Sequence, residues 1–145
     1  MSVFDEVAAI VHPMPKPEEV PEDVFNDVCQ EIDEARKKMS FNLEMSWDAD
    51  PEENEPLLSA IGAALYRKAQ AEAELRRLVA YGREFTRPRP YKLADLATAS
   101  GMSVSGVRTA YGHNDVDVVA QAIGRKPREW RAAAADDPPK TGTEA

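Results

Sequence analysis

The segment at residues 103–109 carries side chains suited to binding a charged partner. It offers three hydroxyl groups and one guanidinium and contains no acidic residue. Hydroxyls donate to phosphate oxygens or base edges, and arginine can donate two hydrogen bonds to one guanine. The side chains other than arginine are small, which allows a helix to approach a groove closely. The predicted nucleic-acid contacts in this segment are Ser103, Val104, Ser105, Arg108 and Thr109.

A second group of candidate contacts lies just before this segment, where cations and prolines alternate. The cations are Arg83, Arg87, Arg89 and Lys92, and the last three are predicted DNA contacts. Such a segment can form an arm on the phosphate backbone or in the minor groove. A basic interdomain linker fits the pattern equally well.

Catalytic and metal-binding patterns are not found in the sequence. Neither GxxxxGK[ST] nor GxGxxG occurs, and one cysteine with two histidines cannot supply a typical zinc site. A Ser-His-Asp site built from Ser103, His113 and Asp115 would need a pocket that no pattern indicates. We therefore expect no enzymatic activity, no cofactor and no metal.

Two short helices are predicted to hold the 103–109 segment. Leu93, Leu96 and Ala97 suit a helix that ends near residue 99, and Gly101 can adopt the positive φ of a tight turn. Ser103 is placed to cap a second helix. The inward positions of that helix are Val107 and Ala110.

This pattern resembles the helix-turn-helix of bacterial transcription regulators, as in repressors, TetR-type regulators and sigma-factor DNA-binding regions. The resemblance covers about 20 of the 145 residues, and Ser100 and Ala110 depart from the pattern. It implies a sequence-specific regulator that binds double-stranded DNA, whereas the alternative is a helical hairpin without nucleic acid. The matching positions are Ala97, Gly101, Met102, Ser103 and Val107.

The chain beyond the two short helices predicts one more helix. Residues 116–123 follow an Asn114-Asp115 cap signal, and we expect them to pack behind the second short helix. Trp130 lies in a further basic cluster, where it either packs against that helix or contacts DNA. The cluster contains Arg125, Lys126, Arg128 and Arg131, and residues 132–145 are predicted to be a disordered tail.

A long helix is predicted over residues 56–86, ahead of the 87–131 DNA-binding region. An apolar stripe runs from Leu57 through Ile61 and Leu65 to Val79. About 30 residues give a helix of roughly 45 Å, which is longer than one small domain needs. We therefore expect homodimerisation through this helix, with burial inside one subunit's bundle as the alternative.

Residues 1–55 form a predicted acidic interaction region. A short helix is predicted over 2–11, ahead of the proline-rich stretch 12–21. This stretch is typical of a linker, and the minor alternative is a peptide ligand for a partner's groove. A helix with one apolar stripe begins at Pro21 and ends in the basic residues 36–38. Phe41, Leu43 and Met45 alternate with polar residues, which predicts an extended segment followed by an acidic loop.

The charge distribution supports two separate roles for the two halves of the chain. Residues 1–59 hold 16 acidic and 4 basic residues, whereas residues 67–131 hold 7 acidic and 13 basic ones. We predict a mainly all-α, cytoplasmic, nucleoid-associated DNA-binding regulator that acts as a homodimer and is not a membrane protein. The alternative is an adaptor, antitoxin-like or sigma-factor-binding, whose acidic region binds a protein partner.

Overall fold

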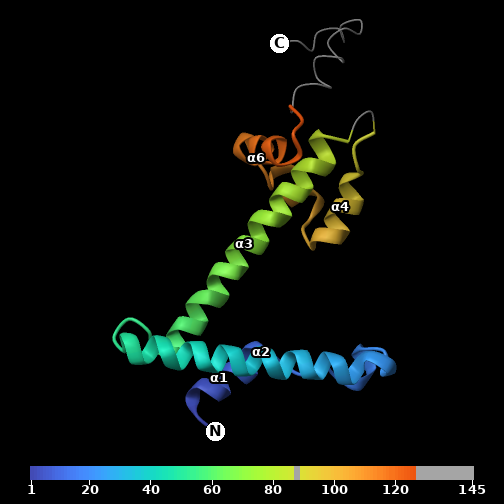
Figure 1. The fold of residues 1–145 in the computed structure, drawn as a ribbon. Coiled ribbons are helices and arrows are strands. Elements are labelled where there is room, and N and C mark those ends of the chain that lie inside the picture. The colour runs from blue at the N-terminus through green and yellow to red at the C-terminus, as the bar shows by residue number, and fades with distance from the viewer. Residues whose placement is uncertain (87–88, 127–145) are drawn as a thin grey trace, which may run out of the picture. The chain divides into compact units, whose positions relative to one another are not determined.

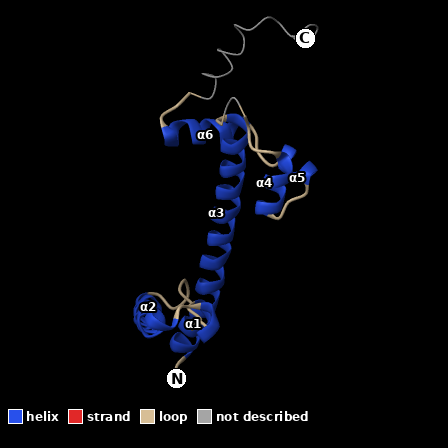
Figure 2. Ribbon diagram, turned by 90° about the vertical axis from the view of Figure 1, so that its right-hand side faces the viewer, coloured by secondary structure: helices blue, strands red, loops and turns tan. Residues whose placement is uncertain are grey.

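The computed structural model describes residues 1–86 and 89–126, and every regular element in these ranges is a helix (Figure 2). The all-α prediction is confirmed for this part of the chain. None of the helices described is long and apolar enough to cross a membrane. The α-helices are α1 (Val3–Val11), α2 (Glu22–Ala49), α3 (Pro56–Glu84), α4 (Leu93–Ser100), α5 (Val104–Thr109) and α6 (His113–Ile123), and a short 3-10 helix covers Pro17–Glu19.

The chain divides into two compact units. The N-terminal unit is Met1–Lys68, and the C-terminal unit begins at Ala69. The division falls within α3, so the first part of this helix belongs to the N-terminal unit and the rest to the C-terminal unit. Each unit is described by itself below.

Polar contacts join α1 to α2 in the N-terminal unit, where the two helices lie side by side (Figure 1). Asp5 accepts hydrogen bonds from the backbone N and Oγ of Ser2, at the start of α1. Its other carboxylate oxygen accepts from Ser40 Oγ at 2.7 Å. Arg36 Nε donates to the carbonyl of His12 at 2.7 Å, so α2 also holds the residue that follows α1.

The Asp5 contacts predict a pH-dependent stability. The hydroxyl of Ser40 and the donors of Ser2 lower the pKa of the Asp5 carboxyl below its ordinary value of 3.8. A lowered pKa in the folded state stabilises the fold above pH 3.8, and this contribution is lost as the pH falls through the lowered value. Asp5→Asn should therefore reduce the melting temperature at about pH 7, and the gap to wild type should close at low pH.

Thermal melting between about pH 7 and about pH 2.5 tests this expectation. Glu6→Gln is the matched control, because it removes the neighbouring carboxylate, which makes no side-chain hydrogen bond in the described part of the chain. A gap of constant size for Asp5→Asn at every pH would contradict a role for the Asp5 charge.

The prediction of an extended segment after residue 40 is wrong, because α2 continues to Ala49. Met39 and Leu43 follow Ala35 at four-residue steps on the face near His12, whereas Phe41 and Met45 are exposed. The apparent alternation therefore came from two different faces of one helix. The predicted end of this helix at the basic residues 36–38 is also wrong. The helix continues because no helix-breaking residue occurs before Pro51.

The long helix is confirmed as α3, which ends at Glu84 rather than at residue 86. Pro56 is its first residue, and the Glu55 carboxylate accepts from the backbone N of Leu58 at 2.7 Å. Gly82 lies inside the helix, where a Cβ would stand 3.4 Å from Leu96. The absence of a side chain thus lets α4 approach α3 closely.

Two small hydrophobic clusters form the core of the C-terminal unit. Val107 of α5 packs with Val79 and Ala97, and α6 contributes to the second cluster. The prediction that this last helix packs behind α5 is wrong, since its buried side chains contact the end of α3. Tyr111 packs against both clusters. The second cluster consists of Ala80, Phe85, Val116 and Val119.

Candidate nucleic-acid interface

The turn between α4 and α5 has the predicted backbone conformation. Gly101 ends α4 with φ 74° and ψ 9°, in the left-handed region that favours glycine. A Cβ at this position would meet no other atom within 4 Å, so the requirement concerns the backbone rather than space. Ala97, four residues earlier, is buried against α3 as predicted.

The start of α5 is fixed by a side-chain cap. Ser103 Oγ accepts a hydrogen bond from the backbone N of Gly106 at 2.9 Å, which confirms the predicted cap. A Cβ on residue 106 would lie 3.1 Å from that oxygen, so glycine keeps the cap free of crowding. Val107 is fully buried, and Ala110, the second predicted inward residue, is half-buried.

Burial of Val107 turns the remaining side chains of α5 toward solvent. Thr109 Oγ1 donates within the helix, to the carbonyls of Ser105 or Gly106, and its lone pairs stay available. Arg108 has no hydrogen bond or ion pair within the described part of the chain. The structure thus brings five predicted contacts onto one short exposed surface, which we call the α5 face: Ser103, Val104, Ser105, Arg108 and Thr109.

The predicted basic arm is divided by the structure. Arg83 Nη1 donates to the carbonyl of Tyr91 at 2.7 Å, and the Tyr91 backbone N donates to Gly82, so this arginine holds the chain returning to α4. Arg89 and Lys92 are exposed, and Lys92 is the residue that precedes the first turn of α4. Arg87 lies outside the described residues.

Arg125, the first residue of the second predicted basic cluster, makes contacts within the protein. The Arg125 guanidinium lies 5.7 Å from the centre of the Phe85 ring, and its Nη2 donates to the Phe85 carbonyl at 2.8 Å. Arg125 therefore joins the end of α6 to the end of α3. Trp130, Arg128, Arg131 and residues 132–145 lie outside the described residues.

Tyr111 is a residue that sequence reasoning missed. Its hydroxyl donates to Glu84 Oε2 at 2.7 Å, and its ring packs against both core clusters. Arg76 approaches Asp115 at 3.8 Å, and Asp115 also accepts from the backbone N of Gly112, so α6 begins at His113. Spacing offers no signal for the hydrogen bond of Tyr111, because Glu84 lies 27 residues away along the chain.

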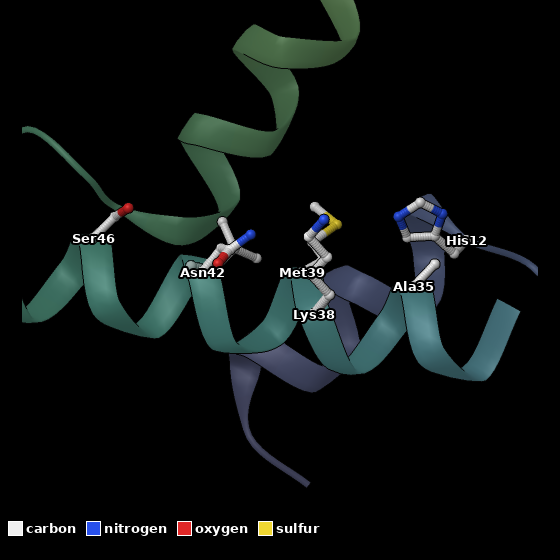
Figure 3. Close-up of a pocket in the computed structure, with 7 residues that line it drawn as sticks. His12, Ala35, Lys38, Met39, Asn42 and Ser46 are labelled. Carbon is white, nitrogen blue, oxygen red and sulfur yellow. The ribbon is translucent and has the colours of Figure 1, made fainter. Parts of the chain in front are cut away.

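Outside the α5 face lie a hollow of about 240 Å³, lined by residues that include Asp5 of α1 and Arg36 of α2, and two others. The larger, about 380 Å³, belongs to the N-terminal unit and lies along α2, with His12 on its rim and with Lys38, Met39 and Asn42 along the helix (Figure 3). The smaller, about 200 Å³, lies between α3 and α6 and is mainly apolar. Neither includes a predicted DNA contact. Among the described residues, no group of three or more His, Cys, Asp or Glu side chains could hold a metal ion.

The candidate interface is therefore the exposed surface of one short helix. It combines a buried valine, a side-chain cap and a left-handed glycine, which together fix which side of α5 meets solvent. Comparison with known proteins found no matching family model, no matching curated protein and no matching solved structure.

Proposed function

We propose that the chain is a sequence-specific DNA-binding transcription regulator that acts as a homodimer, with α4 and α5 as its helix-turn-helix. The observation that carries this proposal is the composition of the α5 face. It is exposed, has no acidic residue, and holds small or hydroxyl side chains around a single arginine that has no partner among residues 1–86 and 89–126. A helix with this surface suits the major groove, which is about 12 Å wide.

The burial of Val107 supports the proposal because, in a helix that recognises DNA, some residues must pack against the domain and others must contact the bases. Side chains that contact bases cannot also be buried in the core, and in α5 different residues are buried and exposed. Val107 contacts Val79 and Ala97, whereas Arg108, about 100° further round the helix, is exposed. In this proposal Arg108 contacts a guanine edge, and the hydroxyls of Ser105 and Thr109 contact phosphates or bases.

Arg89 and Lys92 supply contacts to the phosphate backbone in this proposal. Both are exposed and precede α4, whereas Arg83 is engaged with Tyr91. Phosphate contacts orient a protein on DNA without reading its sequence, and each one releases counterions. The acidic N-terminal segment makes no contact with DNA in this arrangement.

The double variant Arg89→Ala/Lys92→Ala should weaken binding to all DNA sequences by a similar factor. The slope of log affinity against log salt should flatten by roughly one to two units. Fluorescence anisotropy over a salt series measures both effects. Lys16→Ala/Lys38→Ala removes the same charge from the N-terminal unit and should leave the slope unchanged. An unchanged slope for the first variant would make this segment a linker.

The proposal as a whole is tested by selecting ligands for the full-length protein from a pool of random DNA duplexes. A homodimer should enrich one motif with two-fold symmetry, because the symmetry of the protein repeats in its site. Failure to enrich any motif, at salt concentrations where binding is detectable, would reject sequence-specific recognition.

A further inference from the structure

The first part of α3 carries large apolar side chains that nothing in the N-terminal unit covers. Leu57, Leu58, Ile61 and Leu65 are 48, 66, 56 and 66% exposed. With about 100° of rotation per residue, these four fall within roughly 100° of the helix circumference. Ala60, on the other side of the helix, is 9% exposed. We call these four leucine and isoleucine residues the α3 patch.

The α3 patch is separated from the rest of the apolar stripe predicted from the sequence. Val79 and Ala80, near the other end of α3, are buried inside the core of the C-terminal unit. The stripe therefore serves two purposes: part of it is buried in this core, and the patch has no covering surface within the N-terminal unit. Leu75 and Leu78, which lie between the two parts, are 37 and 58% exposed. Contiguous exposed apolar surface of this kind marks an interaction site in a protein of this size.

The charges on either side of the patch have opposite signs. Glu52, Glu53 and Glu55 precede it, whereas Arg67 and Lys68 follow it. Two parallel copies of α3 would place acid beside acid and base beside base, which is unfavourable. Two antiparallel copies would place the basic end of each patch beside the acidic end of the other.

We infer that the α3 patch is the homodimer seam and that two copies of α3 pair in antiparallel orientation. A two-fold axis between Ile61 and Leu65 sets Ile61 of one copy beside Leu65 of the other. Lys68 then lies about 4.5 Å along the axis from Glu55 of the second copy, within reach of its side chain.

Antiparallel pairing also reduces the electrostatic repulsion between the acidic N-terminal segments of the two copies. Residues 1–59 hold 16 acidic and 4 basic residues, so two copies of this segment repel each other. Antiparallel pairing places the starts of the two α3 helices, which follow these segments in the chain, at opposite ends of the seam. This inference rests on the homodimer named in the proposed function and does not depend on DNA binding.

Disulfide cross-linking in the full-length chain tests the orientation directly. Leu58→Cys and Lys68→Cys are introduced separately into a Cys29→Ser background, since Cys29 is the native thiol. A disulfide needs Cα atoms within about 7 Å, whereas antiparallel pairing separates identical positions here by roughly 15 Å along the axis. Each variant alone should remain uncrosslinked under mild oxidation, and a mixture of the two should form a mixed dimer.

Cross-linking of either variant with itself would show parallel pairing and overturn the inference. Failure of the mixture to cross-link would overturn the seam. The selection of DNA ligands is independent of this result. A mixed disulfide with no enriched DNA motif would support the seam and contradict the proposed DNA-binding function. An enriched motif bound by a monomer would support the function and contradict the seam.

A charge placed in the seam provides a second test. Leu65→Arg should reduce the mass by light scattering from twice 16.0 kDa to 16.0 kDa at micromolar concentration. Tyr66→Arg is the matched control, because Tyr66 is 65% exposed and lies about 100° further round the helix. Both variants should keep the helical circular dichroism of the wild type. A dimer that survives Leu65→Arg, or a wild type of 16.0 kDa, would contradict the seam.

Discussion

Replacing Arg108 with alanine should lower affinity for the selected DNA site about ten- to a hundredfold, while affinity for random DNA falls much less. Arg108 is the one long cationic side chain of α5, and it is exposed beside the buried Val107. A bidentate contact with guanine contributes roughly 1–3 kcal/mol of discrimination between bases, which gives this range of affinities. Titrations of the selected duplex and of a scrambled duplex measure the ratio.

The Arg108→Lys variant tests the geometry of that contact. Lysine keeps the charge but lacks the planar pair of donors, so it should restore little of the specificity. Arg77→Ala, a substitution on α3, removes an equal charge and should leave the ratio of specific to random affinity unchanged. Equal losses on both duplexes for Arg108→Ala would make Arg108 a phosphate contact.

The predictions that held for the candidate site are those with local causes. The positive φ at Gly101 and the hydrogen bond of the Ser103 cap depend on residues within five positions of each other in the chain. Conformational freedom of glycine and side-chain capping act over such distances, so residue type and spacing were sufficient. The orientation of α5 follows from them, once Val107 is recognised as the inward residue.

The features that sequence reasoning missed depend on contacts across long stretches of chain. Tyr111 joins Glu84 over 27 positions, and Arg125 joins Phe85 over 40. Nothing in the spacing of these residues distinguishes a core tyrosine from a surface one, or a stacked arginine from a phosphate contact. The position of α6 against the end of α3 follows from these partners, which is why its predicted packing failed.

The failure over residues 40–49 has a different cause. A short run of alternating apolar residues fits the period of a strand, but it also fits a helix that exposes part of its apolar surface. Leu43 is half-buried, whereas Phe41 and Met45 are 61 and 54% exposed. Sequence reasoning assumed that apolar residues share one buried face, and the exposed ones broke this assumption.

The substitution Val107→Asp should unfold the C-terminal unit, with a loss of more than about 4 kcal/mol. Val107 is 0% exposed and packs with Val79 and Ala97. The neighbours of this cluster are apolar apart from the hydroxyl of Tyr111, which already donates to Glu84. The helical circular dichroism should fall in part, and all DNA binding should be lost. Val107→Ala should cost about 1–3 kcal/mol and preserve the helices.

The matched control for Val107→Asp is Val104→Asp, on the same helix. Val104 is 41% exposed and belongs to the α5 face, so an aspartate there remains in water and leaves the fold intact. Its charge should nevertheless abolish DNA binding, because it repels the phosphates that α5 approaches. The pair therefore separates folding from recognition: one variant loses both, and the other loses recognition alone. Equal melting temperatures for the two variants would mean that α5 is buried on a different side and that the α5 face is assigned wrongly.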